Sequence, residues 1–177
     1  MSADEKALVF LSIGSNIDRQ RNIQSVLDQL AGHFGELVIS SVYESEAVGF
    51  EGDPFYNLVV GIHTDLSVGA LFESLRDLEY SHGRCRSGAK FSSRTLDVDI
   101  LTYDQQVGDI DGVALPRAEI LYNAFVLQPL AEIAPELSHP VEKKTYQQLW
   151  NEYDKNKQKL WPVDFEWCGE LISRCLG

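Results

Sequence analysis

The sequence predicts an α+β fold in which strands and helices follow one another in the order βαββαβ. Short apolar segments rich in β-branched residues alternate with longer segments whose apolar residues recur at helical spacing. Glycine, proline and other turn-forming residues separate these segments. No internal repeat or linker interrupts the 177 residues. We therefore expect one domain over 1–177, with a core at about 7–140 and a C-terminal extension at about 141–177.

The first half of this pattern is a strand, a helix and a second strand. Residues 7–12 are apolar and predict a buried strand. The following helix has apolar residues at positions i, i+3, i+4 and i+7 of one face: Ile23, Val26, Leu27 and Leu30. Gly32 or Gly35 is expected to end this helix. The β-branched residues within 37–43 predict the second strand.

The second half is a strand, a helix and a final strand. Residues 56–63 predict the third strand, and Thr64 or Asp65 is expected to cap the second helix. That helix carries an apolar face made of Leu66, Ala70, Leu71, Leu75 and Leu78. A polar loop over 81–93 leads into a fourth strand at 96–103.

This order is typical of a ferredoxin-like sandwich, in which helices pack on an antiparallel sheet. Beyond it, residues 105–113 predict a hairpin or loop, and short helices are expected at 126–133 and 146–153. The tail, with Trp161 and Trp167, is expected to pack on the outside of the sheet.

The composition indicates which partners the chain is unsuited to bind. The formal net charge of −12 and the pI of about 4.6 disfavour nucleic acids and anionic membranes. The chain has no apolar run of the roughly 18 residues that a membrane helix needs, and its start lacks the pattern of a signal peptide. We therefore expect a cytoplasmic protein that is a monomer. Three cysteines without metal-ligand spacing predict free thiols: Cys85, Cys168 and Cys175.

A basic segment stands out in this acidic chain. Residues 83–94 contain no acidic residue and four basic ones: Arg84, Arg86, Lys90 and Arg94. The planar guanidinium of arginine suits phosphate because it donates two parallel hydrogen bonds. Serine and glycine in the same segment favour a mobile loop, which could close over a ligand. The alternative is a solvated charged loop without a ligand.

Two aspartates follow the basic segment directly. Because successive side chains of a strand face opposite sides, Asp97 and Asp99 share one face. Two carboxylates on one face raise each other's pKa, and a divalent cation relieves their repulsion. The alternative is a half-buried strand with a polar solvent face. A polyphosphate loop joined to paired carboxylates favours phosphoryl transfer, which depends mostly on positioning and charge neutralisation.

A third candidate is the aromatic loop at 49–57. Phe50, Phe55 and Tyr56 could stack on a flat heterocycle, and the amide of Asn57 offers a donor and an acceptor to its edge. The alternative is an aromatic core with an asparagine at a strand start. The sequence contains neither a P-loop nor a dinucleotide-binding glycine motif.

Five segments together resemble the 6-hydroxymethyl-7,8-dihydropterin pyrophosphokinases of the folate pathway, over about residues 8–140. They are IGSN at 13–16, FYN at 55–57, GRCR at 83–86, SRTLDVDIL at 93–101 and FVLQPLAEIAP at 125–135. The resemblance implies a ferredoxin-like fold. It also implies transfer of pyrophosphate from ATP to the hydroxymethyl group of the pterin, with release of AMP.

The resemblance also implies roles for particular residues. Asp97 and Asp99 would bind two Mg²⁺ ions and would act in catalysis together with Arg84 and Arg94. The residues expected to bind ATP are Glu79, Arg84, Arg86, Lys90, Arg94, Ile100 and Arg117. The residues expected to bind the pterin are Ser45, Val48, Phe55, Asn57 and Phe125.

The sequence departs from the family pattern at three places. Residues 90–93 read KFSS where the family usually has arginine-tryptophan-glycine-proline, Arg117 stands in place of a histidine, and Asn123 stands in place of an arginine. These departures leave open a diverged paralogue that binds pterin or nucleotide with weak or altered catalysis. An RNA-binding module would need a basic sheet face, and a non-catalytic small-molecule sensor would not need both aspartates.

Overall fold

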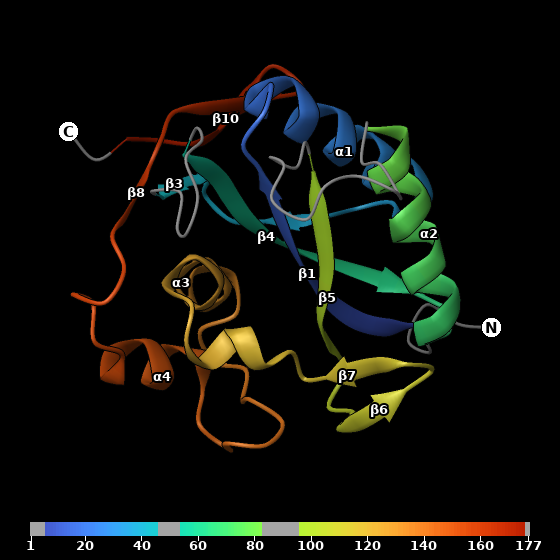
Figure 1. Ribbon diagram of the computed structural model, residues 1–177, viewed down its shortest axis with the longest axis vertical. Coiled ribbons are helices and arrows are strands. Elements are labelled where there is room, and N and C mark those ends of the chain that lie inside the picture. The colour runs from blue at the N-terminus through green and yellow to red at the C-terminus, as the bar shows by residue number, and fades with distance from the viewer. Residues whose placement is uncertain (1–5, 46–53, 83–95, 176–177) are drawn as a thin grey trace, which may run out of the picture.

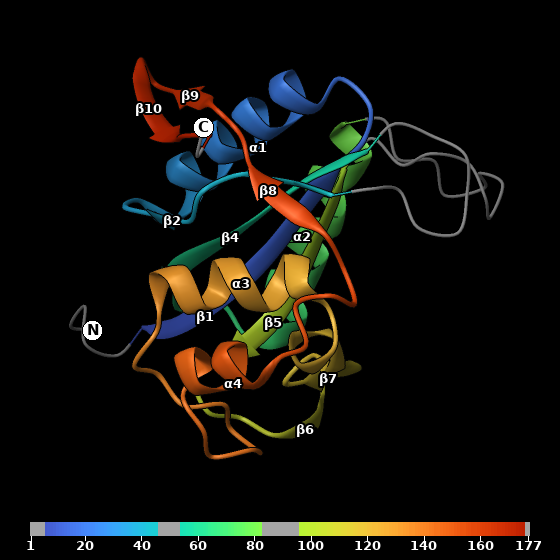
Figure 2. The ribbon, with the colours of Figure 1, turned by 90° about the vertical axis from the view of Figure 1, so that its left-hand side faces the viewer.

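The computed structural model describes residues 6–45, 54–82 and 96–175 (Figure 1). A mainly antiparallel sheet lies between two layers of helices, as Figures 1 and 2 show from two sides. Adjacent strands, from one edge to the other, are β5 (Asp97–Tyr103), β1 (Ala7–Ser15), β4 (Phe55–Thr64), β3 (Tyr43–Ser45) and β8 (Leu160–Pro162). β2 (Val38–Ile39) pairs with β4 beside this row. The expected α+β architecture is confirmed.

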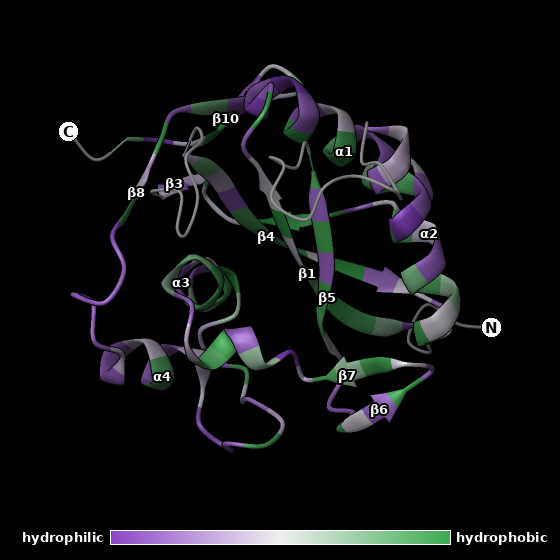
Figure 3. Cartoon of the chain, in the orientation of Figure 1, coloured by the Kyte–Doolittle hydropathy of each residue, from purple (hydrophilic) through white to green (hydrophobic). Residues whose placement is uncertain are grey.

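One face of the sheet packs on α1 (Arg19–Phe34) and α2 (Val68–Ser81). Alternate residues of β1, β4 and β5 point toward these helices and are buried: Val9, Leu11, Ile13, Leu58, Val60, Ile62, Val98 and Ile100. The predicted helix face is buried against them, as Ile23 and Leu27 show. Figure 3 shows polar residues on the outer surfaces of both helices, so each helix is amphipathic.

The opposite face packs on α3 (Ala124–Ile133), with η2 (Ala118–Leu121) before it and α4 (Tyr146–Glu152) beyond it. The strand residues that face this way are Phe10, Val59 and Leu101. Most of α3 is apolar in Figure 3, because it lies between the sheet and α4. This face is apolar only along part of its length, and its remaining part carries the candidate site.

The prediction of one continuous strand at 37–43 was wrong. The structure has two short strands there, β2 and β3. Two side chains take the place of backbone partners between them. The hydroxyl of Ser40 accepts from the Val59 N–H at 2.9 Å, and the carboxylate of Glu132 accepts from the Ser41 N–H at 3.1 Å. The ladder is therefore interrupted between β2 and β3.

The expected caps were partly wrong. Ser67, rather than Thr64 or Asp65, caps α2, because its hydroxyl accepts from the Ala70 N–H. Thr64 instead ends β4. Gly35 ends α1 with a φ of 81°, which glycine adopts without strain. The predicted hairpin after the fourth strand is β6 (Gly108–Ile110) and β7 (Val113–Leu115).

The C-terminal extension does more than pack on the outside of the sheet. β8 adds a strand to the sheet edge by pairing with β3. A hairpin of β9 (Phe165–Trp167) and β10 (Glu170–Ser173) then lies against α1. There the indole N–H of Trp167 donates to Asp28 at 2.9 Å. Within the described residues, no helix is long and apolar enough to cross a membrane.

His139 gives the fold a specific pH dependence. The ring is 2% exposed, and its Nδ1 accepts from the backbone N–H groups of Val141 and Glu142. Burial lowers the pKa of His139, which Glu142 opposes in part. This histidine therefore stays neutral in the fold at a pH where it is protonated in the unfolded chain. Its contribution to stability is present above the ordinary pKa of about 6.5 and is lost as pH falls toward the lower, folded pKa.

We predict that the thermal midpoint falls between pH 7 and pH 5.5, and that His139→Asn reduces this fall because its side-chain oxygen replaces Nδ1 without titrating. Thermal melts of both proteins across this pH range measure the effect. Equal slopes for the two proteins would contradict the prediction.

Candidate active site

The polar part of the sheet face beside α3 is set by the pairing of three strands. Gly14 of β1 lies opposite Asn57 of β4 on one side and opposite Asp97 of β5 on the other. Since Val98 and Ile100 point toward α1 and α2, Asp97 and Asp99 point to the other face. Asn57 shares that face, because Val59, two residues along β4, packs in the cluster around α3.

Gly14 keeps the centre of this site open. A Cβ built on it would lie 3.0 Å from Oδ1 of Asn57 and 3.7 Å from the ring of Phe55. The other end of the Asn57 amide donates to the hydroxyl of Ser45 at 2.9 Å, and this bond is buried. The structure therefore brings together the predicted residues Ser45, Phe55 and Asn57 beside the two aspartates.

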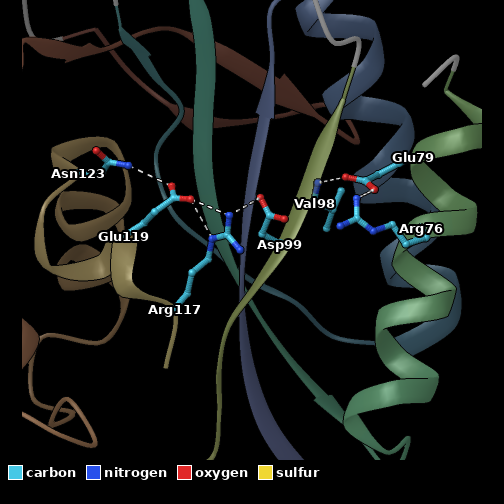
Figure 4. Close-up of polar contacts among 7 residues, drawn as sticks. All are labelled: Arg76, Glu79, Val98, Asp99, Arg117, Glu119 and Asn123. Carbon is cyan, nitrogen blue, oxygen red and sulfur yellow. Dashed lines mark hydrogen bonds and ion pairs between the residues drawn. The ribbon is translucent and has the colours of Figure 1, made fainter. Parts of the chain in front are cut away.

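Asp99 lies in a partly desolvated position beside Arg117. The pKa of Asp99 is raised by burial, lowered by Arg117 and raised again by Asp97. The Nη2 atom of Arg117 is 3.8 Å from Oδ2 of Asp99, as Figure 4 shows. Asp97 therefore raises the pKa of Asp99, as the sequence predicted, although burial raises it more.

A β-bulge positions Arg117. The register of β1 against β5 shifts at Leu101, which has no partner on β1. The Leu101 carbonyl accepts from the Arg117 N–H at 2.8 Å. The guanidinium is held by Glu119, which accepts from Nη2 at 2.6 Å and from Nε at 3.0 Å. Glu119 was not among the predicted residues, and its position two residues after Arg117 was the only signal for it.

Glu119 extends this contact toward α3. Its second oxygen accepts from the side-chain amide of Asn123 at 3.0 Å, so a polar chain runs from Asp99 to the start of α3 (Figure 4). Arg117 and Glu119 also line an open pocket, together with Phe72, Gly112, Val113, Ala114, Ala118 and Tyr122.

Glu79 and Ile100 lie on the other side of β5. The carboxylate of Glu79 is fully buried and accepts from Arg76 at 2.8 Å and from the Val98 N–H at 2.9 Å (Figure 4). Ile100 points into the core beneath α1 and α2. The side chain of Ile100 is therefore separated from the aspartates by the sheet.

Phe125 is the second residue of α3 and is half-buried against the cluster on that face. Five predicted site residues lie outside the described residues: Val48, Arg84, Arg86, Lys90 and Arg94. Their roles stay predictions. In the ranges that the structure covers, no cluster of three or more metal-ligating side chains is found. The pair Asp97 and Asp99 suits Mg²⁺, which takes one or two carboxylates and completes its shell with phosphate oxygens and water.

Asn16 is a further residue that the sequence did not single out for a role. It follows β1 two residues after Gly14 and is 1% exposed. Neither atom of its side-chain amide has a hydrogen-bond partner within the described part of the chain. A buried amide without partners is costly, and its position at the end of β1 is consistent with a place beside the site.

Comparison with known proteins decides the family. The sequence model described as 7,8-dihydro-6-hydroxymethylpterin-pyrophosphokinase (HPPK) matches residues 10–135. The chain belongs to this family. A pyrophosphokinase from Synechocystis is 35% identical over 151 residues, which cover 80% of this chain and 76% of that protein. One from Pseudomonas aeruginosa is 34% identical over 136 residues, covering 75% and 83%. Both are named 2-amino-4-hydroxy-6-hydroxymethyldihydropteridine pyrophosphokinase.

Solved structures support the fold of this pyrophosphokinase. The Plasmodium falciparum HPPK-DHPS structure with pterin and p-hydroxybenzoate matches with a TM-score of 0.67 at 14% identity, over 90% of this chain. The chain spans only about half of that protein, 47% of its length. At this identity the likeness concerns the fold alone, and the sequence relatives carry the family assignment.

Substitutions of Glu79 can distinguish a contact that stabilises the fold from a contact that binds ATP. We predict that Glu79→Ala lowers the free energy of unfolding by about 1–3 kcal/mol, because the buried Val98 N–H loses its acceptor and Arg76 its partner. Glu79→Gln keeps an acceptor and should cost less. Denaturant unfolding measures both, and an alanine variant as stable as the parent would contradict the prediction. If Glu79→Gln is stable but has a raised KM for ATP, Glu79 also contributes to ATP binding.

Proposed function

We propose that this chain transfers pyrophosphate from ATP to 6-hydroxymethyl-7,8-dihydropterin and releases AMP, in folate biosynthesis. The observation that carries the proposal is the pairing around Gly14, which brings Asn57 and Asp97 to its two sides on one face of the sheet. One side offers an amide and an aromatic ring to a flat heterocycle, and the other offers paired carboxylates to a metal-bound phosphate. The family assignment supports the same reaction.

The pterin would occupy the side of the site near β3 and β4. The amide of Asn57, fixed by Ser45, would read the edge of the heterocycle through a donor and an acceptor. Phe55 and Phe125 would stack on its faces, and Val48 would also contact it. Gly14 contributes by leaving space, since a larger residue there would press on Asn57.

The metal and nucleotide would occupy the side near β5. Asp97 and Asp99 would hold two Mg²⁺ ions, which when bound would neutralise phosphate charge. The pocket beside Arg117 would take part of the nucleotide. Glu79 and the main chain of Ile100 would contribute from the other side of β5. The basic residues Arg84, Arg86, Lys90 and Arg94 would hold the triphosphate.

The reaction would be a displacement at the β-phosphorus of ATP. The hydroxymethyl oxygen loses its proton to solvent and forms a bond to this phosphorus, while the bond from the phosphorus to the oxygen of the α-phosphate breaks and AMP leaves. The protein would position the two substrates in line, with Asn57 orienting the pterin and Arg117 placed near the phosphates. We further propose that the chain acts as a monomer in the cytoplasm.

A second candidate function has an observation in its favour. Arg117 is engaged by Glu119 and lies close to Asp99, so its charge is already partly neutralised. A diverged paralogue that binds pterin or nucleotide with slow or altered chemistry would fit this arrangement.

We predict AMP release from ATP in the presence of Mg²⁺ that depends on 6-hydroxymethyl-7,8-dihydropterin. The measurement is AMP formation with and without the pterin, and with excess EDTA as the metal-free control. Pterin-dependent AMP would support the pyrophosphokinase reaction. Tight pterin binding without AMP would favour the diverged paralogue, and the absence of both would reject the proposal.

Asp99→Asn should separate stability from catalysis. We predict that this variant loses about 100-fold or more of the turnover, because the metal loses a carboxylate ligand. Its thermal midpoint at pH 7 should rise, because burial disfavours the charged form of Asp99. Asp77→Asn, on the exposed side of α2, is the matched control and should leave both values unchanged. Full turnover in Asp99→Asn would remove Asp99 from the metal site.

A further inference from the structure

We infer that Gln158, in the C-terminal extension, is a positioning residue that fixes the start of α3 and with it Phe125; this inference rests on the proposed function for the role of Phe125. Gln158 lies outside residues 10–135, which the family model matches. The segment between α4 and β8 passes one end of α3 in Figure 2.

The start of α3 lacks a cap of its own. Asn123 occupies the N-cap position, but its side chain makes no capping bond. The first helical N–H, that of Ala124, instead donates to Oε1 of Gln158 at 2.7 Å. A residue 34 positions away in sequence thus satisfies a group that a local side chain usually satisfies.

The other end of the Gln158 amide fixes Asn123. Nε2 of Gln158 donates to Oδ1 of Asn123 at 2.9 Å, while Nδ2 of Asn123 donates to Glu119 at 3.0 Å. Both ends of the Asn123 amide are therefore engaged, one by the extension and one by the residue that holds Arg117. The departure from arginine at position 123 is accommodated by this pair of bonds.

A third contact ties the extension to the same place. The hydroxyl of Tyr153 donates to the carbonyl of Tyr122 at 2.8 Å. The extension therefore holds three consecutive residues, 122–124, directly before Phe125. Two residues after Gln158, β8 begins and pairs with β3, where Leu160 lies opposite Ser45.

The extension thus supports both walls of the proposed pterin site. Its first part fixes the helix start that carries Phe125, and β8 fixes the strand that carries Ser45, the partner of Asn57. Gln158 holds the Ala124 N–H directly before Phe125, whereas it reaches Arg117 only through Asn123 and Glu119. Its loss should therefore affect the pterin more than ATP.

The test uses the full chain with Gln158→Ala, and Gln147→Ala as the matched control. Gln147 belongs to the same extension, but its side chain bonds only to the exposed Asn151 among the described residues. We expect Gln158→Ala to raise the KM for the pterin about 5- to 20-fold, the effect of losing one or two hydrogen bonds. The KM for ATP should change less than about twofold, and Gln147→Ala should match the parent.

Tyr153→Phe removes the third contact, and with it the interaction of that hydroxyl with the Ala124 backbone, but keeps the Gln158 side chain. It should also raise the pterin KM selectively, so it tests the idea if Gln158→Ala folds poorly. Amide hydrogen exchange at Ala124 and Phe125 adds a readout that needs no turnover, and exchange should be faster in Gln158→Ala. An unchanged pterin KM, or equal rises for both substrates, would overturn the inference. If the parent releases no pterin-dependent AMP, the proposed function fails, and unchanged exchange at Ala124 would then reject the positioning of α3 as well.

Discussion

The site depends on the antiparallel pairing of β1 with both β4 and β5. Because Gly14 faces Asn57 on one side and Asp97 on the other, one register places the amide and the carboxylates together. A shift of one residue in either pair would turn those side chains into the core beneath α1 and α2. The apolar residues next to them in the strands, such as Ile13 and Val98, prevent such a shift, because they are buried on the face that packs on α1 and α2. The core therefore fixes the register, and the register fixes the site.

The same sheet face is divided between packing and chemistry. Along one part, Phe10, Val59 and Leu101 pack against α3 and stabilise the fold. Along the other, polar groups are partly removed from water. The pKa of Asp99 is raised by its burial, and the amide of Asn16 is buried without a partner in the described residues. Such groups reduce stability unless a ligand or cation engages them, which is the expected character of a binding site rather than of a core.

Contacts between distant segments hold this arrangement in place. The bulge at Leu101 directs Arg117 to Asp99, and Glu119 connects Arg117 to Asn123. The C-terminal extension adds contacts at the start of α3, through Gln158, and at β3, through β8. The candidate site is thus built from strands of the matched family region and is supported by a segment outside it.

The sequence by itself determined the order of elements, the paired aspartates on one strand face and the family resemblance. Each depends on local periodicity or on contiguous motifs, which are readable along one chain. Only the tertiary structure decided that the strand at 37–43 is interrupted, because Ser40 and Glu132 act through partners elsewhere in the sequence. It also decided the contacts of Gly14, Glu119 and Gln158. These contacts arise from backbone register and from side-chain hydrogen bonds, for which the sequence carries no periodic signal.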